Sequence, residues 1–128
     1  MKRLAKYKHV YVCSPLSAPT KEGITQNMYT ARRKCMELRL HGIRAWAPHA
    51  YLPEFLDDNI AEERELALEF GKKMLDISDA VYAFGERISN GMKSEILYAA
   101  SKGIEIIAAD NLQDELAVVL ADFEGVAK

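Results

Sequence analysis

Apolar residues recur along the chain in two alternating patterns, short continuous runs and longer segments with helical spacing. The short runs have the length and the β-branched or aromatic character of strands buried on both faces of a sheet. The longer segments place apolar residues three or four positions apart, which is typical of amphipathic helices. In chain order the pattern predicts a strand over 9–13, a helix over 27–40, a strand over 43–47, a helix that starts near 61, a strand over 80–84, a helix over 91–102, a strand over 104–108 and a helix over 112–123.

This regular alternation predicts an α/β fold, a single-domain three-layer sandwich with a parallel, flavodoxin- or Rossmann-like sheet of about four to five strands. A length of 128 residues suits one domain spanning 1–128, with residues 1–7 as a basic tail. In the helix that starts near 61, the large apolar residues share one stripe that we expect to face the core: Leu66, Phe70, Met74 and Ile77.

Charge is unevenly distributed along the chain, although the formal net charge is only −2. Residues 1–44 hold 10 Lys and Arg against 2 Asp and Glu, whereas residues 45–128 hold 7 against 17. The near-neutral total gives no support for binding a nucleic-acid polymer. The basic half is interpreted either as ordinary solvated faces or as a field that attracts an anionic ligand.

The two cysteines, Cys13 and Cys35, lie within apolar patterns and lack the spacing of a disulfide framework. We therefore expect reduced core thiols and a cytoplasmic location. The longest stretch without a charged residue runs from His9 to Thr20, which is too short for a membrane span.

Three loops follow the first three predicted strands, over 14–25, 48–59 and 85–91. In a parallel sheet, ligands bind outside the carboxyl ends of the strands, so we expect these loops to converge on one site. His49 is the one histidine placed at such a strand end. Arg64 is interpreted either as an exposed residue of a helix start or as a contact to a phosphate. The histidines and cysteines lack metal-ligand spacing, so we expect no metal site.

The third loop leads into a helix N-terminus, where unpaired backbone N–H groups form a natural anion site. Ser89 supplies a hydroxyl and Gly91 permits close approach of a ligand to the backbone, although Ser89 or Asn90 could simply cap the helix. Glu95 falls at the edge of the packed face of this helix. A half-desolvated carboxylate there, kept ionised by the helix N-terminus, suits a nucleophile or base, and the alternative is a solvent-facing residue.

Five segments together resemble a known family: VYVCSP at 10–15, APH at 47–49, FLDD at 55–58, ERE at 63–65, and FG at 84–85 with ISNGMKSEI at 88–96. They are similar to small bacterial and phage proteins with domain-of-unknown-function labels (DUF4406- and DUF7768-like). That family lies within the nucleoside 2-deoxyribosyltransferase-like superfamily. The resemblance covers nearly the whole chain.

The resemblance implies a role for each residue at a matching position. Glu95 would be the nucleophile that attacks C1′ of the sugar, and Gly91 the residue of close approach. Ser89 would contact a 5′-phosphate, and Ser14 and Pro15 would lie in the first substrate loop. The characterised enzymes of this superfamily also have an Asp eight residues before the Asp at the entry to the third strand, which is Asp79 in this chain. That position is Gly71, and the sequence does not choose among Glu69, Asp76 and Asp58 as a replacement.

The resulting hypothesis is an N-glycosidic hydrolase or transferase that acts on a nucleoside or nucleoside 5′-monophosphate. Glu95 would be catalytic, and the substrate-binding residues would be Ser14, Pro15, His49, Asp58, Arg64, Ser89 and Gly91. No metal or organic cofactor is implied, and the resemblance implies a homo-oligomer. The missing Asp favours the first of two alternatives, a non-catalytic nucleotide-binding module or an oligomeric scaffold with a vestigial pocket.

Overall fold

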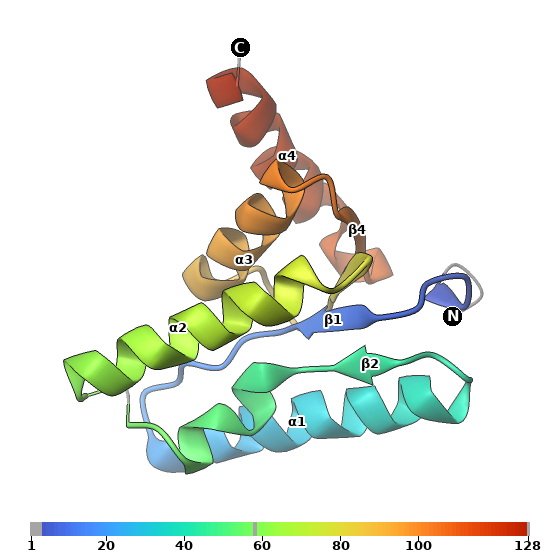
Figure 1. Cartoon of the computed structure of the whole chain (residues 1–128). Coiled ribbons are helices and arrows are strands. Elements are labelled where there is room, and N and C mark those ends of the chain that lie inside the picture. The colour runs from blue at the N-terminus through green and yellow to red at the C-terminus, as the bar shows by residue number, and fades with distance from the viewer. Residues whose placement is uncertain (1–3, 58, 128) are drawn as a thin grey trace.

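The computed structural model describes residues 4–57 and 59–127, with side chains described up to Phe123 (Figure 1). The helices and strands are β1 (Val10–Cys13), α1 (Lys21–Leu40), β2 (Ala45–Trp46), α2 (Ala61–Asp76), β3 (Ala80–Ala83), α3 (Asn90–Ser101), β4 (Glu105–Ala108) and α4 (Gln113–Ala127). Short 3-10 helices in the described part of the chain include η2 (Pro48–Ala50), η3 (Leu52–Glu54) and η4 (Asp110–Leu112). The four strands are parallel and lie in the order β2-β1-β3-β4, which confirms the predicted α/β fold.

Side chains of β1 alternate between two hydrophobic clusters, one on each face of the sheet. Val10 and Val12 pack on the α1 side, whereas Tyr11 and Cys13 pack with residues of α2, α3 and α4. Figure 1 shows α1 on one side of the sheet and α2 with α3 on the other. The sheet is therefore the middle layer of a three-layer sandwich.

Helix α1 begins at Lys21, six residues before the predicted start. The Thr20 side chain caps this end by accepting a hydrogen bond from the Gly23 N–H at 3.0 Å. The first turns are polar and carry too few apolar residues to show helical periodicity. The loop after β1 therefore spans 14–20 rather than 14–25.

The core stripe predicted for α2 is wrong at three of its four residues, whereas the fourth, Met74, packs against the hydrophobic core. Leu66, Phe70 and Ile77 are 54%, 45% and 59% exposed, and Leu75 is the buried residue of this helix. The face that packs on the body carries the smaller side chains Ala67 and Gly71 next to Leu75. Apolar periodicity found the helix but selected mainly its outer face.

Two further segments differ in detail from the sequence prediction. Strand β2 has two residues, Ala45–Trp46, although the flanking Ile43 and Ala47 are buried as the strand pattern over 43–47 indicated. Within the segment predicted as a basic tail, Leu4 is buried in the cluster on the α1 side. Both cysteines are free and buried. No helix in the described part of the chain is both long enough and apolar enough to span a membrane.

Candidate functional site

The carboxyl ends of β1, β2 and β3 bring together segments that are far apart in the sequence. The loop after β1 packs on the loop after β3, because the Pro15 ring lies where a side chain at position 85 would be. A Cβ at Gly85 would meet Pro15 Cδ at 2.8 Å, and Gly85 has a φ of +126°. Glycine is therefore required here for both contact and backbone geometry.

Glu95 lies in the second turn of α3, and its carboxylate turns inward beneath the carboxyl end of β1. The Tyr11 hydroxyl donates a hydrogen bond to Glu95 Oε2, and the Cys13 thiol lies 3.8 Å from Oε1. Both partners are on β1, so the central strand fixes the position of this carboxylate. The side chain is partly buried rather than solvent-facing.

Burial raises the pKa of Glu95 from 4.5 to about 7, and the hydrogen bonds from Tyr11 and Cys13 oppose this shift. Desolvation therefore outweighs the stabilisation of the anion expected from the nearby helix N-terminus. Near neutral pH the carboxyl group is shared between its acid and anionic forms. Such a group suits proton transfer, and its anionic half suits nucleophilic attack.

Ser14 and His49 form a second polar pair at the ends of β1 and β2. Ser14 Oγ lies 2.8 Å from His49 Nε2, and burial lowers the pKa of His49 from 6.5 to about 4. The ring is therefore neutral at physiological pH. His49 Nδ1 is buried without a hydrogen-bond partner among the described residues. A buried nitrogen without a hydrogen-bond partner lowers stability unless a ligand or a water molecule forms a hydrogen bond with it.

Ser89 caps α3, because its side chain accepts a hydrogen bond from the Met92 N–H at 3.3 Å. The capping role and ligand contact are compatible, since the hydroxyl can still donate. Gly91 is exposed, and a Cβ there would meet nothing within 4 Å. The backbone at this end of α3 is therefore open to a ligand.

Of the other residues predicted to bind substrate, Arg64 is exposed on α2 and has no interaction with Ser14, His49 or Glu95 in the described part of the chain. Asp58 lies outside the described residues. Gly71 faces β1, where an added Cβ would lie 3.7 Å from the Tyr11 hydroxyl. The position that carries an Asp in the resembling enzymes is thus next to the hydroxyl that binds Glu95.

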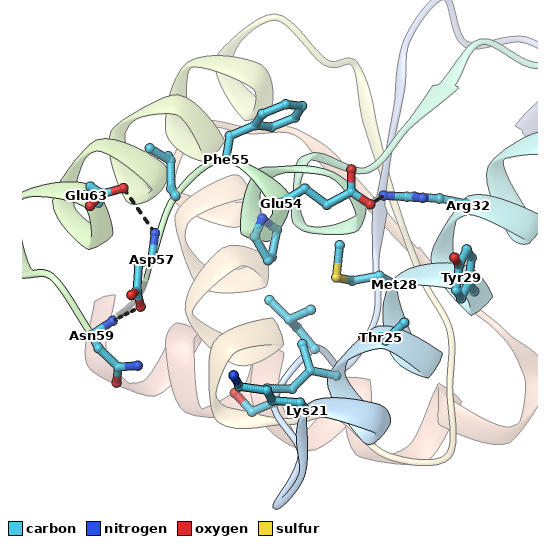
Figure 2. Close-up of a pocket in the computed structure, with 15 residues that line it drawn as sticks. Lys21, Thr25, Met28, Tyr29, Arg32, Glu54, Phe55, Asp57, Asn59 and Glu63 are labelled. Atoms are coloured by element: carbon cyan, nitrogen blue, oxygen red, sulfur yellow. Dashed lines mark hydrogen bonds and ion pairs between the residues drawn. The ribbon is translucent and has the colours of Figure 1, made fainter.

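A cavity of about 580 Å³ lies between α1 and the segment that leads into α2 (Figure 2). This volume is typical of a small-molecule site. Neither Glu95 nor Tyr11 lines it. Its walls are formed by Leu16, Ser17, Lys21, Ile24, Thr25, Met28, Tyr29, Arg32, Pro53, Glu54, Phe55, Leu56, Asp57, Asn59 and Glu63.

Polar contacts fix the walls of this cavity, and two of them are drawn in Figure 2. Arg32 pairs with Glu54 and donates from Nε to the Ala50 carbonyl at 2.8 Å, which ties α1 to the 50–54 segment. On the opposite wall the Asp57 N–H donates to Glu63 Oε1 at 3.2 Å. Because Arg32 is already paired, the cavity does not concentrate positive charge as a phosphate site does.

Asp79, at the entry to β3, has a structural role. Its carboxylate accepts the N–H groups of Lys8 and His9 at 2.8 and 2.7 Å. Among the described residues, no group of three or more His, Cys, Asp or Glu side chains is arranged to hold a metal ion.

Tyr11 is part of the site although its place in the sequence was not predicted to be functional. A signal was present, because a tyrosine in a central apolar strand needs a partner for its buried hydroxyl. The cavity was missed as a unit, since its walls come from segments that are adjacent only in the folded chain.

A comparison with curated proteins finds no match. A family model described as "Domain of unknown function (DUF7768)" matches residues 8–109. The match extends from the start of β1 through β4 and therefore includes the whole sheet and every element around Glu95. The chain belongs to this domain-of-unknown-function family, DUF7768.

Proposed function

We propose that this protein cleaves or transfers the N-glycosidic bond of a nucleoside or nucleoside 5′-monophosphate, with Glu95 as the nucleophile. The observation that carries the proposal is the Glu95 carboxylate, partly buried at the carboxyl end of the sheet and bonded to the Tyr11 hydroxyl. The proposal extends the resemblance to the nucleoside 2-deoxyribosyltransferase-like superfamily from motifs to chemistry.

In the first step a Glu95 carboxylate oxygen forms a bond to C1′ while the bond from C1′ to the base nitrogen breaks. The electron pair of that bond leaves with the base, which must be protonated or carry its own positive charge. In the second step water or another base attacks C1′ and releases the carboxylate. Both steps invert C1′, so the overall configuration is retained.

The open backbone at Gly91 and the Ser89 hydroxyl support binding of substrate oxygens at the start of α3. The neutral Ser14–His49 pair supports a contact to a hydroxyl or a base, with His49 Nδ1 as the group that lacks a partner. No acid occupies position 71, so bases that leave in neutral form are the best substrates to test first.

The test is base release, measured by chromatography on a panel of nucleosides and 5′-monophosphates that includes an N7-methylated purine deoxynucleoside. The cationic base of that compound departs as a neutral molecule without an enzymatic acid. We expect release by the wild type, loss of release in Glu95→Gln, and unchanged release in Glu62→Gln, which removes an exposed carboxylate of α2. A 2′-fluoro-arabino nucleoside should leave its sugar on Glu95, visible by peptide mass spectrometry. Absence of release from every substrate would overturn the proposal.

The cavity favours a second candidate function, binding of a nucleoside without cleavage. It is large enough for such a ligand, apolar side chains such as Met28 and Leu56 form part of its walls, and Glu95 does not line it. This candidate predicts a nucleoside-dependent rise in melting temperature that persists in Glu95→Gln and is lost in Thr25→Trp, which fills the cavity. Catalysis at Glu95 predicts instead that base release is lost in Glu95→Gln and retained in Thr25→Trp.

A further inference from the structure

The loop that leads into α3 is held in place by two residues that follow β4. Asn111 Nδ2 donates a hydrogen bond to the Gly85 carbonyl at 2.7 Å, and the Ile88 N–H donates to Glu115 Oε2 at 2.8 Å. Both side chains lie beyond residue 109, where the match to the family model ends. This attachment is therefore a feature of this chain that adds to the elements covered by the family model.

Glu115 brings a negative charge to the end of α3 that would otherwise suit an anion. The N-terminus of a helix attracts anions through its unpaired N–H groups and its dipole. Here the Glu115 carboxylate already accepts the N–H of Ile88, the residue directly before the Ser89 cap. Glu115 forms no ion pair with any residue that the structure describes, so its charge is not neutralised there. An internal anion therefore lies where a phosphate would bind.

Several other donors at this end of α3 also have partners within the chain. The Met92 N–H donates to Ser89 Oγ at 3.3 Å, and the Ser89 N–H donates to Met92 Sδ at 3.4 Å. Among the described residues, the backbone N–H groups of Asn90 and Gly91 have no partner, and the Ser89 hydroxyl can still donate. These few donors suit a hydroxyl group, whereas a phosphate dianion presents three strong acceptor oxygens and requires a compensating positive charge.

The charged side chains around this end of α3 do not supply that positive charge. Residues 85–93 contribute Glu86, Arg87 and Lys93, and Glu115 adds a second carboxylate, so two negative charges balance two positive ones. All four side chains are exposed. Arg64, the other cation considered for a phosphate, has no interaction with Ser14, His49 or Glu95 among the described residues. The start of α3 therefore lacks the net positive charge typical of a phosphate site.

The start of α3 is within reach of a sugar held at Glu95. Because an α-helix rises about 1.5 Å per residue, the Gly91 backbone lies about 6 Å from Glu95 along the helix axis. A sugar whose C1′ meets the Glu95 carboxylate can therefore extend its 5′ substituent to Gly91. We propose, building on the proposed function, that the substrate is a nucleoside with a free 5′-hydroxyl and that Glu115 excludes 5′-monophosphates. Ser89, which the resemblance assigns to a 5′-phosphate, then contacts the hydroxyl instead.

The test compares base release from N7-methyl-2′-deoxyguanosine and from its 5′-monophosphate at low ionic strength. We expect kcat/KM of the wild type to favour the nucleoside roughly ten-fold or more, because like charges repel and specificity follows from a repulsive contact. Glu115→Gln keeps an acceptor for the Ile88 N–H but removes the charge, and should reduce this ratio roughly three-fold or more. Glu115→Ala also frees the Ile88 N–H and should reduce it further. Asp114→Asn is the matched control, because it removes a neighbouring exposed carboxylate of α4 and should keep the ratio of the wild type.

Binding without chemistry separates this inference from the proposed reaction. In Glu95→Gln, the amide NMR signals of residues 88–91 are followed during titration with 2′-deoxyguanosine and with its 5′-monophosphate. We expect the nucleoside to bind more tightly, and Glu115→Gln in the same background to reduce the difference. If no substrate releases its base, the proposed reaction fails, whereas the two titrations still decide which 5′ group is accepted. Equal or tighter binding of the monophosphate, a difference that Glu115→Gln leaves unchanged, or binding of neither compound would overturn the inference.

Discussion

Gly71 lies in the middle of α2 at a half-buried position that faces β1. A Cβ there would lie 3.7 Å from the Tyr11 hydroxyl, which is an ordinary van der Waals contact. Because that hydroxyl binds Glu95, a carboxyl group at position 71 would join the same polar cluster. We expect Gly71→Asp to supply the missing acid and to raise the rate of base release roughly 100-fold, as a positioned general acid does.

Gly71→Asn is the matched control, since it has the same shape as Gly71→Asp but no proton to give at neutral pH. The rates are compared on nucleosides whose bases leave with difficulty, where an acid matters most. Equal rates in Gly71→Asp, Gly71→Asn and the wild type would contradict a general-acid role for this position.

At the scale of single residues, helical phase was enough to place Glu95 at the edge of a packed face. Its partners were not predictable from local sequence, because Tyr11 is 84 positions away and meets Glu95 only after β1 and α3 pack together. The direction of the Glu95 pKa shift was missed for the same reason. It depends on how completely tertiary contacts remove water from the carboxylate.

The first turn of α1 depends on the side chain of Thr20, which accepts the Gly23 N–H. We expect Thr20→Ala to lower the free energy of unfolding by about 1 kcal/mol and Thr20→Ser to have little effect, because serine can form the same cap. Urea unfolding measures the difference, and hydrogen exchange at residues 21–24 locates it. Because Lys21 and Ile24 line the cavity, Thr20→Ala should also weaken the binding of any ligand there. Equal stability of both variants would show that the cap contributes nothing.

At the scale of elements, apolar runs identified all four strands, and the runs are unbroken in the central strands β1 and β3, which have no polar side to obscure the pattern. Helix faces were harder to predict. The buried face of α2 combines Leu75 and Met74 with small residues, and three other large apolar side chains of the predicted stripe lie on the exposed face. Sequence periodicity reports that a helix has an apolar stripe, but the packing partner decides which surface covers it.

At the scale of the whole molecule, two buried groups titrate in opposite directions. Glu95 keeps its proton to about pH 7 when folded but only to about 4.5 when unfolded, so a rising pH favours unfolding. His49 takes up a proton near pH 4 when folded but near 6.5 when unfolded, so a falling pH favours unfolding. Between about pH 5 and pH 7 the two effects nearly cancel, and their combined contribution to stability is almost flat.

Removing either group should therefore expose the slope that belongs to the other. In Glu95→Gln, where only His49 remains, the free energy of unfolding should rise by about 2 kcal/mol from pH 5 to pH 7. In His49→Asn, where only Glu95 remains, it should fall by about 2 kcal/mol over the same range. Urea unfolding at fixed protein concentration measures both slopes, with Glu62→Gln as the variant that should follow the wild type. Two variants with parallel profiles would contradict this account, because burial raises the pKa of Glu95 and lowers that of His49 and must therefore give slopes of opposite sign.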